Sequence, residues 1–149
     1  MTSSGSIKKE QDLYEFLKKN FIPDLTPTTR AISRYDCYST EHSLDIELKC
    51  RRTHYDQLLI EKGKYEALMS RTGMFGTVPV YINSTPQGVW AFYLKEADLK
   101  WETRSLPKQT DFGERYHIKK EIGYLDVKTE GIDLLSLLRS SSGWQDSPA

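Results

Sequence analysis

Polar and apolar positions along this 149-residue chain follow two different periods. Apolar side chains recur at helical spacing over residues 9–21, which predicts a first helix that the prolines at 23 and 27 bring to an end. Residues 31–38 and 44–51 read as strands, and the short polar segment between them predicts an antiparallel hairpin. The first half of the chain therefore begins with a helix followed by a hairpin.

A second helix is predicted over residues 53–70, because Thr53 followed by Asp56 resembles a capping box and apolar residues then recur on one face. Residues 71–76 are predicted to form a loop. Two further strands, 78–83 and 89–94, are rich in Val, Tyr, Trp and Phe and are joined by a Ser-Thr-Pro-Gln-Gly turn. The pattern thus repeats as a second helix and a second hairpin.

The pattern weakens beyond residue 95. Residues 98–111 are polar and irregular, 117–125 fit a short strand or a helix, and 132–138 fit a short helix. The polar ends predict a flexible N-terminus over 1–8 and a flexible tail over 139–149, leaving one domain over 9–138. Helix, hairpin, helix and hairpin in this order predict a mixed α/β fold, with a central mixed sheet flanked by helices.

Composition narrows the class of protein. Hydrophobic residues make up 38% of the chain and charged residues 28%, which is typical of a packed globular domain. The 21 basic and 21 acidic residues balance, so net charge neither favours nor excludes a polyanionic partner. Nucleic-acid binding would therefore depend on local clusters. Arg51, Arg52, Lys62 and Lys64 form one such candidate cluster, with an ordinary solvated rim as the alternative.

The two cysteines, Cys37 and Cys50, show no metal-binding spacing and are expected to be buried, inert thiols. The first 21 residues lack the apolar run of a signal peptide, and no stretch reaches the roughly 18 apolar residues of a membrane span. We therefore expect a cytoplasmic protein in a reducing compartment, without a membrane partner.

The strand at 44–51 carries the candidate chemistry. Because strand residues alternate between faces, Asp45, Glu47 and Lys49 share the face opposite the apolar side chains. If the hairpin turn is centred between Glu41 and His42, Asp36 faces Glu47 with about 5 Å between the Cβ atoms. Two carboxylates this close repel each other unless a cation lies between them, and oxygen ligands of this kind suit Mg²⁺ or Mn²⁺.

This inference depends on the register of the hairpin. A shift of one residue would move Asp36 to the other face, and Asp45 would then replace it as a ligand. The simpler alternative is a solvated strand face with ordinary cross-strand ion pairs. The position of the strand, between two predicted helical segments, argues against that alternative because unpaired buried charges are costly.

Asp36, followed eleven residues later by Glu47-Leu48-Lys49 at the end of an apolar strand and then by a predicted amphipathic helix, resembles the PD-(D/E)xK nuclease superfamily. The resemblance is to its small phage-type and Holliday-junction-resolvase-like members. It implies a restriction-endonuclease-like core and a Mg²⁺- or Mn²⁺-dependent endodeoxyribonuclease, with branched or junction DNA as a candidate substrate. It further implies that Asp36, Glu47 and the backbone carbonyl of Leu48 bind the metal and that Lys49 orients the attacking water.

The same resemblance implies further site residues and an assembly. Members often add an acidic residue from the first helix, which Glu15 or Glu10 matches, and a polar residue from the second helix. For the second position the sequence offers Gln57, Glu61 or Lys64. The implied partner is DNA, and a homodimer is an open option because cutting two strands needs two sites.

Two departures from the family pattern keep other functions open. No proline precedes Asp36, and the usual separate first strand is hard to find in residues 20–32. One alternative is a catalytically inactive nuclease-like module that binds nucleic acid or a protein partner. A second is a sheet-edge interaction protein without a role in nucleic-acid binding.

Overall fold

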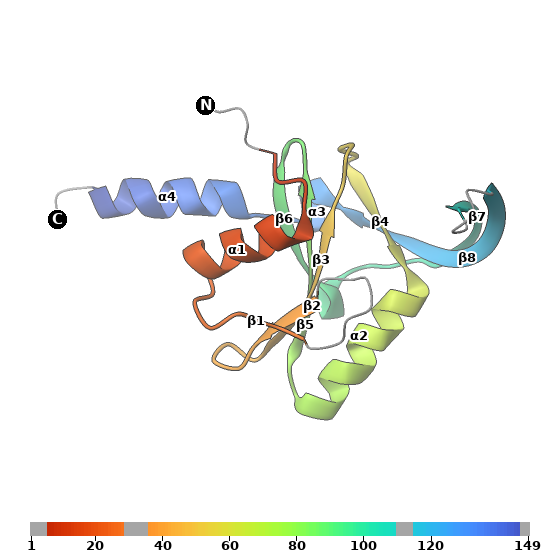
Figure 1. Ribbon diagram of the computed structural model, residues 1–149, viewed down its shortest axis with the longest axis horizontal. Coiled ribbons are helices and arrows are strands. Elements are labelled where there is room, and N and C mark those ends of the chain that lie inside the picture. Colours follow the sequence, from red (N-terminus) through yellow and green to blue (C-terminus); the bar gives the residue numbers. More distant parts are fainter. Residues whose placement is uncertain (1–5, 29–35, 110–114, 147–149) are drawn as a thin grey trace.

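A computed structural model describes residues 6–28, 36–109 and 115–146 of the chain (Figure 1). A six-stranded sheet has the order β1-β2-β3-β5-β6-β9, and a three-stranded sheet has the order β4-β8-β7. The first sheet consists of β1 (Thr26–Pro27), β2 (Asp36–Ser39), β3 (Leu44–Cys50), β5 (Val78–Thr85), β6 (Gly88–Tyr93) and β9 (Ile132–Asp133). The second consists of β4 (Gln57–Glu61), β7 (Glu102–Gln109) and β8 (Arg115–Asp126). The helices are α1 (Glu10–Asn20), α2 (Lys62–Phe75), the 3₁₀ helix η2 (Leu94–Glu96), α3 (Val127–Glu130) and α4 (Leu134–Asp146).

The six-stranded sheet is mixed. β3 and β5 run parallel, because β4 and α2 carry the chain back between them, whereas the other neighbouring pairs are antiparallel. α1 and α2 lie on opposite sides of this sheet (Figure 1). The predicted mixed α/β fold with a central sheet flanked by helices is therefore confirmed.

Alternation along β3 divides the core in two. Ile46 and Leu48 pack with α1 residues such as Leu13 and Leu17 in one cluster. On the other side of the sheet, Tyr81 and Phe92 pack against α2, β4 and β8 in a second cluster, whose further buried members are Leu58, Ile60, Leu68, Leu94, Leu125 and Val127. Asp45, Glu47 and Lys49 belong to the α2 side, as the period of two predicts.

The prediction for residues 53–70 is wrong in its first half. Residues 57–61 form β4, and the helix begins only at Lys62 and continues to Phe75, through the predicted loop at 71–76. Leu58 and Ile60 are almost fully buried while Gln57 is exposed, which is the alternation of a strand. β8 supplies the backbone partners of β4, and no local pattern could reveal a partner more than sixty residues away.

The C-terminal third contains more regular structure than its sequence suggests. β7 and β8 pair over eight residues as a long antiparallel arm that projects from the body of the molecule (Figure 1). Residues 117–125 therefore form a strand, one of the two alternatives left open. α4 continues to Asp146, beyond the helix predicted over 132–138 and into the predicted tail.

Two further findings concern the ends of elements. The first strand that was hard to find in the sequence is β1, a two-residue edge strand paired with β2. The predicted strand over 31–38 lies partly outside the described residues; its described part is β2.

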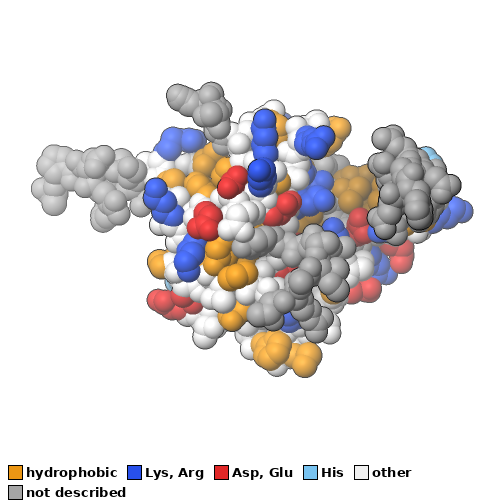
Figure 2. Space-filling model, in the orientation of Figure 1, with side chains coloured by type: hydrophobic (Ala, Val, Ile, Leu, Met, Phe, Trp, Pro, Cys, Tyr) orange, Lys and Arg blue, Asp and Glu red, His pale blue; other side chains and the backbone are white. Residues whose placement is uncertain are grey.

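Figure 2 shows charged side chains of both signs interspersed over one face, with a hydrophobic patch at the end of α2, where Met74 and Phe75 are exposed. Among the described residues, every helix is too short or too polar to cross a membrane.

Candidate metal centre

The β2–β3 hairpin brings two carboxylates together. Asp36 is the direct partner of Glu47, and Tyr38 is the partner of Asp45. This is the register that a turn centred between Glu41 and His42 requires. Directly opposed residues have Cβ atoms about 5 Å apart, so both carboxylates lie on the α2 side of the sheet within reach of one small cation.

Asp36 has an unsatisfied oxygen. Its Oδ1 is buried and has no hydrogen-bond partner within the part of the chain that the structure describes, while Oδ2 lies 4.0 Å from Arg71 Nη1. A buried polar atom without a partner costs free energy, so such an atom calls for an explanation. A cation shared with Glu47 would satisfy Oδ1, and two carboxylates suit a hard divalent ion.

Glu47 lies in a buried position beside β5. It is only 8% exposed, and its register partner on β5 is Tyr81. Burial raises the pKa of Tyr81 to about 12; the negative charge of Glu47 acts in the same direction, against the nearby Arg51. The Tyr81 phenol therefore stays neutral beside Glu47 at physiological pH.

Lys49 follows Glu47 on the same face and is half-buried, with Asn83 as its partner on β5. Asn83 is fully buried; its Oδ1 accepts a 2.6 Å hydrogen bond from Arg51 Nε, while its Nδ2 has no partner among residues 6–28, 36–109 and 115–146. Leu48, between the two functional side chains, packs into the α1-side core. Its burial anchors the strand segment that presents Glu47 and Lys49.

Asp45 occupies a different environment. One oxygen accepts a 3.1 Å bond from Arg71 Nε, and the other accepts a 2.5 Å bond from the Thr77 hydroxyl. With both oxygens engaged and only 5% exposure, Asp45 fits a structural role better than that of an alternative ligand. Sequence reasoning missed Arg71 because it assigned residues 71–76 to a loop.

The other candidate residues are dispersed. Glu15 is exposed on α1, on the opposite side of the sheet, and accepts a bond from Gln11. Glu10 accepts a 3.0 Å bond from the backbone N–H of Cys50. Gln57 was predicted to lie on a helix, but it lies on β4, opposite Asp126. Neither Glu15 nor Gln57 therefore takes the helical position beside the carboxylate pair that the resemblance implies.

The predicted basic cluster is also divided. Arg52 is exposed, whereas Arg51 is half-buried and donates a hydrogen bond to Asn83. Lys62 Nζ lies 3.6 Å from Glu121, and Lys64 is half-buried on α2. A salt bridge also joins Lys120 to Glu61, so acidic partners offset part of the positive charge near α2.

A second group of possible metal ligands lies elsewhere. Asp24, Glu41 and His42 place one ligand atom each within 4.8 Å of one another near the β2–β3 turn. Both oxygens of Asp24 already accept hydrogen bonds, from the Ser39 hydroxyl and the Glu41 N–H, and these bonds lower the pKa of Asp24. We therefore assign this group to the structure of the turn.

Comparison with known proteins gives a likeness at the level of fold. No protein-family model and no curated protein matches the sequence. Among solved structures, the chain is similar to Hjc, a Holliday junction resolvase from the archaeal hyperthermophile Archaeoglobus fulgidus. The TM-score is 0.54 at 16% sequence identity, over 87% of this chain and 96% of that chain. The protein therefore has a resolvase-like α/β fold, in agreement with the restriction-endonuclease-like core that its sequence implies.

Proposed function

We propose that this protein is a divalent-metal-dependent nuclease that hydrolyses DNA phosphodiester bonds. Its metal site would be formed by Asp36 and Glu47. The observation that carries the proposal is the pairing of Asp36 with Glu47, together with the buried Oδ1 of Asp36 that lacks a hydrogen-bond partner among the described residues. The resolvase-like fold supports it at a coarser level.

Each site residue then has a role. Asp36 and Glu47, together with the backbone carbonyl of Leu48, would hold Mg²⁺ or Mn²⁺. When bound, such an ion acidifies a water molecule and neutralises charge on the phosphate. Lys49 carries a compact positive charge on the same face as Glu47, which suits it to orient the attacking water and to stabilise the developing negative charge.

The substrate follows from the fold and the resemblance. We propose DNA, with branched or junction DNA as the preferred form, because the structurally similar archaeal protein is a Holliday junction resolvase. Mg²⁺ and Mn²⁺ are both candidates, since both accept carboxylate and phosphate oxygens.

The proposal is tested by incubating the protein with labelled duplex, single-stranded and four-way-junction DNA, with and without Mg²⁺ or Mn²⁺. Wild-type protein should cleave only with metal, and Lys49→Ala should lose cleavage by a factor of about 10² or more. Lys19→Ala, which removes an exposed lysine on α1, is the matched control and should cut at the wild-type rate. Wild-type cleavage by Lys49→Ala would refute the assignment.

One observation favours a second candidate, a nuclease-like module that binds nucleic acid without cleaving it. Arg71 contacts Asp45 and lies within ion-pair distance of Asp36, so a resident cation already offsets part of the negative charge. Titration calorimetry distinguishes the two candidates. Absence of Mn²⁺ binding, with DNA binding retained, would select the non-catalytic module.

A further inference from the structure

A groove of about 700 Å³ lies between the β3–β4 connection and the β7–β8 arm. Tyr55 lines one wall, Arg104 and Tyr124 line the other, and Arg51 and Leu59 lie between them. Neither the metal centre nor the fold accounts for exposed aromatic and guanidinium groups gathered at this place. The groove is formed only because β4 pairs with β8 and thereby brings the arm beside the connection.

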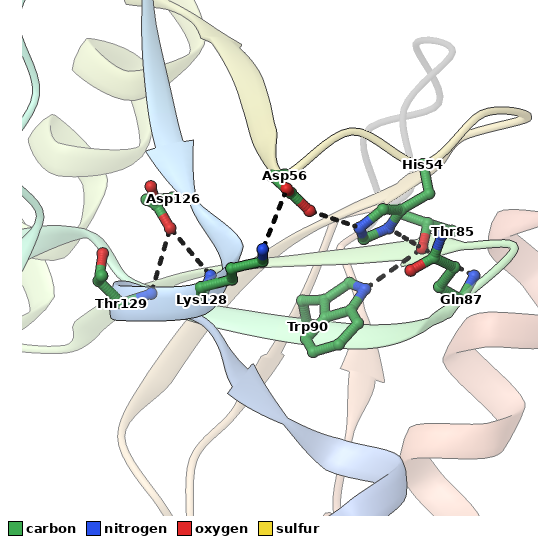
Figure 3. Close-up of polar contacts among 8 residues, drawn as sticks. All are labelled: His54, Asp56, Thr85, Gln87, Trp90, Asp126, Lys128 and Thr129. Carbon is green, nitrogen blue, oxygen red and sulfur yellow. Dashed lines mark hydrogen bonds and ion pairs between the residues drawn. The ribbon is translucent and has the colours of Figure 1, made fainter.

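Tyr55 is exposed between two anchored neighbours. Its side chain is 63% exposed, whereas His54 and Asp56 on either side are anchored (Figure 3). His54 Nδ1 lies 2.9 Å from the Thr85 hydroxyl, and Asp56 Oδ2 lies 3.4 Å from Lys128 Nζ. The backbone carbonyl of Asp56 also accepts a 2.8 Å bond from the Val127 N–H. These contacts anchor the residues on either side of Tyr55, which limits how much backbone must be ordered when a ligand binds.

The opposite wall is also ordered. Arg104 is exposed on β7, and its Nη1 donates a 2.5 Å hydrogen bond to the Tyr124 hydroxyl on β8. Such a bond still leaves other guanidinium N–H groups of Arg104 available to donate. This wall thus offers a cation next to an aromatic ring.

Arg51 joins the groove to the carboxylate pair. Its Nη2 donates to the Leu59 carbonyl at 2.5 Å and to the Tyr81 hydroxyl at 3.1 Å, and Tyr81 is the register partner of Glu47. Arg51 and Glu47 are four residues apart on or just beyond β3, which is about 13 Å along a strand. The groove therefore lies at the end of the strand that carries Glu47.

The charge of the groove favours an anion. Arg51 and Arg104 contribute two guanidinium groups, while the single carboxylate of Asp56 is offset by Lys128 and lies near His54. Tyrosine rings provide faces on which bases can stack, and this requires bases that are not already stacked within a duplex. Guanidinium groups beside the exposed ring of Tyr55 and the half-buried ring of Tyr124 are features that suit the backbone and bases of a single strand.

We propose that this groove binds an unpaired DNA strand and leads it to Asp36 and Glu47. The identity of the polymer as DNA rests on the proposed function. The groove thereby makes an unpaired arm, as in a flap or a branched molecule, part of the preferred substrate. Tyr55 stacks on a base, and Arg104 contacts a backbone phosphate.

The test measures binding alone, without metal and without cleavage. A fluorescent oligothymidylate is titrated in EDTA with wild type, Tyr55→Ala and Arg104→Ala, and its anisotropy is followed. Tyr55→Ala should weaken binding about tenfold, the loss expected for one stacked base. Arg104→Ala should weaken binding and reduce the slope of log K against log salt by about 0.7.

Matched controls come from the same chain. Tyr93→Ala removes a 42% exposed tyrosine from β6, and Arg139→Ala removes an exposed arginine from α4. Both should bind the oligonucleotide like wild type. Tyr55→Phe keeps the ring and should retain binding, and unchanged melting temperatures would show that every variant folds.

Three results would overturn the inference: wild-type affinity in both groove variants, equal losses in Tyr55→Phe and Tyr55→Ala, or duplex DNA bound as tightly as the single strand. The proposed function is judged separately, by metal-dependent cleavage and the Lys49→Ala variant. Cleavage that persists while the groove variants bind normally would reject only the groove. Specific single-strand binding without cleavage would reject only the nuclease.

Discussion

Asp36 lies directly opposite Glu47 in the β2–β3 ladder, with one carboxylate oxygen of Asp36 buried and without a hydrogen-bond partner in the described part of the chain. A buried oxygen without a hydrogen bond costs free energy, and like charges on directly opposed strand residues repel each other. Asp36 is therefore expected to reduce stability when no cation is bound. A cost of this kind is expected of a residue that serves binding or catalysis.

Asp36→Asn tests this relationship through stability. The amide removes the repulsion with Glu47, while the ion pair that is lost, at 4.0 Å between partly exposed groups, is worth little. In EDTA the free energy of unfolding should stay the same or rise by up to about 1 kcal/mol. Thermal unfolding with and without Mn²⁺ measures this, and the rise in melting temperature caused by Mn²⁺ should disappear in the variant. A large loss of stability in EDTA would instead show that Asp36 has a structural role.

Asp45→Asn should behave in the opposite way. The substitution weakens two buried hydrogen bonds, from Arg71 and Thr77, so it should destabilise the protein by about 1–3 kcal/mol. Mn²⁺ binding, measured by calorimetry below the melting temperature, should persist. Glu66→Gln, at an exposed position on α2, is the control for the loss of one negative charge. Loss of Mn²⁺ binding in Asp45→Asn alone would make Asp45 the ligand.

Alanine substitutions at two glycines should change stability in opposite directions, one through backbone entropy and the other through a steric clash. Gly73 lies in α2, where an added Cβ would meet no atom within 4 Å, so Gly73→Ala should raise stability by about 0.5–1 kcal/mol. At Gly131, an added Cβ would lie 2.6 Å from the backbone carbonyl oxygen of Val127. Gly131→Ala should therefore lower stability by about 1 kcal/mol or more. Urea denaturation of both variants measures the difference, and equal effects would contradict the geometry of the α3 end.

The thiols should be unreactive in the folded protein. Burial, assisted by neighbouring carboxylates, raises the pKa of Cys37 and of Cys50 from 9.0 to about 12. At pH 8 only about one thiol in 10⁴ is then ionised, and the thiolate is the reactive form. Mass spectrometry after iodoacetamide treatment should find no modification at pH 8, and two modified cysteines after unfolding in urea. Rapid labelling of native Cys37 would contradict its burial.

The raised pKa values of Cys37 and Cys50 make the stability of the protein depend on pH. The folded-state pKa values are raised, so the unfolded chain loses its thiol protons first as pH increases. The stability from this source is fully present below about pH 9 and is lost as pH rises toward 12. Urea denaturation at pH 8 and pH 10.5 should show a lower free energy of unfolding at the higher pH. An unchanged value would contradict the raised pKa values.

The parts of the fold that could be predicted depend on patterns among residues close together in the sequence. The alternation in residues 44–50 placed Asp45, Glu47 and Lys49 on one face, because the strand period is a local property. The sequence placed Asp36 opposite Glu47 only for a turn centred between Glu41 and His42, and the structure has that register. The helical period predicted α1, and two apolar strands with a turn predicted the β5–β6 hairpin. These elements form the central sheet and present the candidate metal ligands.

Tertiary contacts decided the rest. Residues 57–61 became a strand because β8 offers backbone partners there, and this pairing overrode the helical reading of the segment. The contact of Arg71 with Asp45, and the groove between Tyr55 and Arg104, likewise join residues far apart in the chain. The amino-acid sequence by itself determined which side chains share a face, because the geometry of the backbone repeats every few residues. Which faces meet depended on burial and hydrogen bonding across the whole domain, and these appear only when the chain is folded.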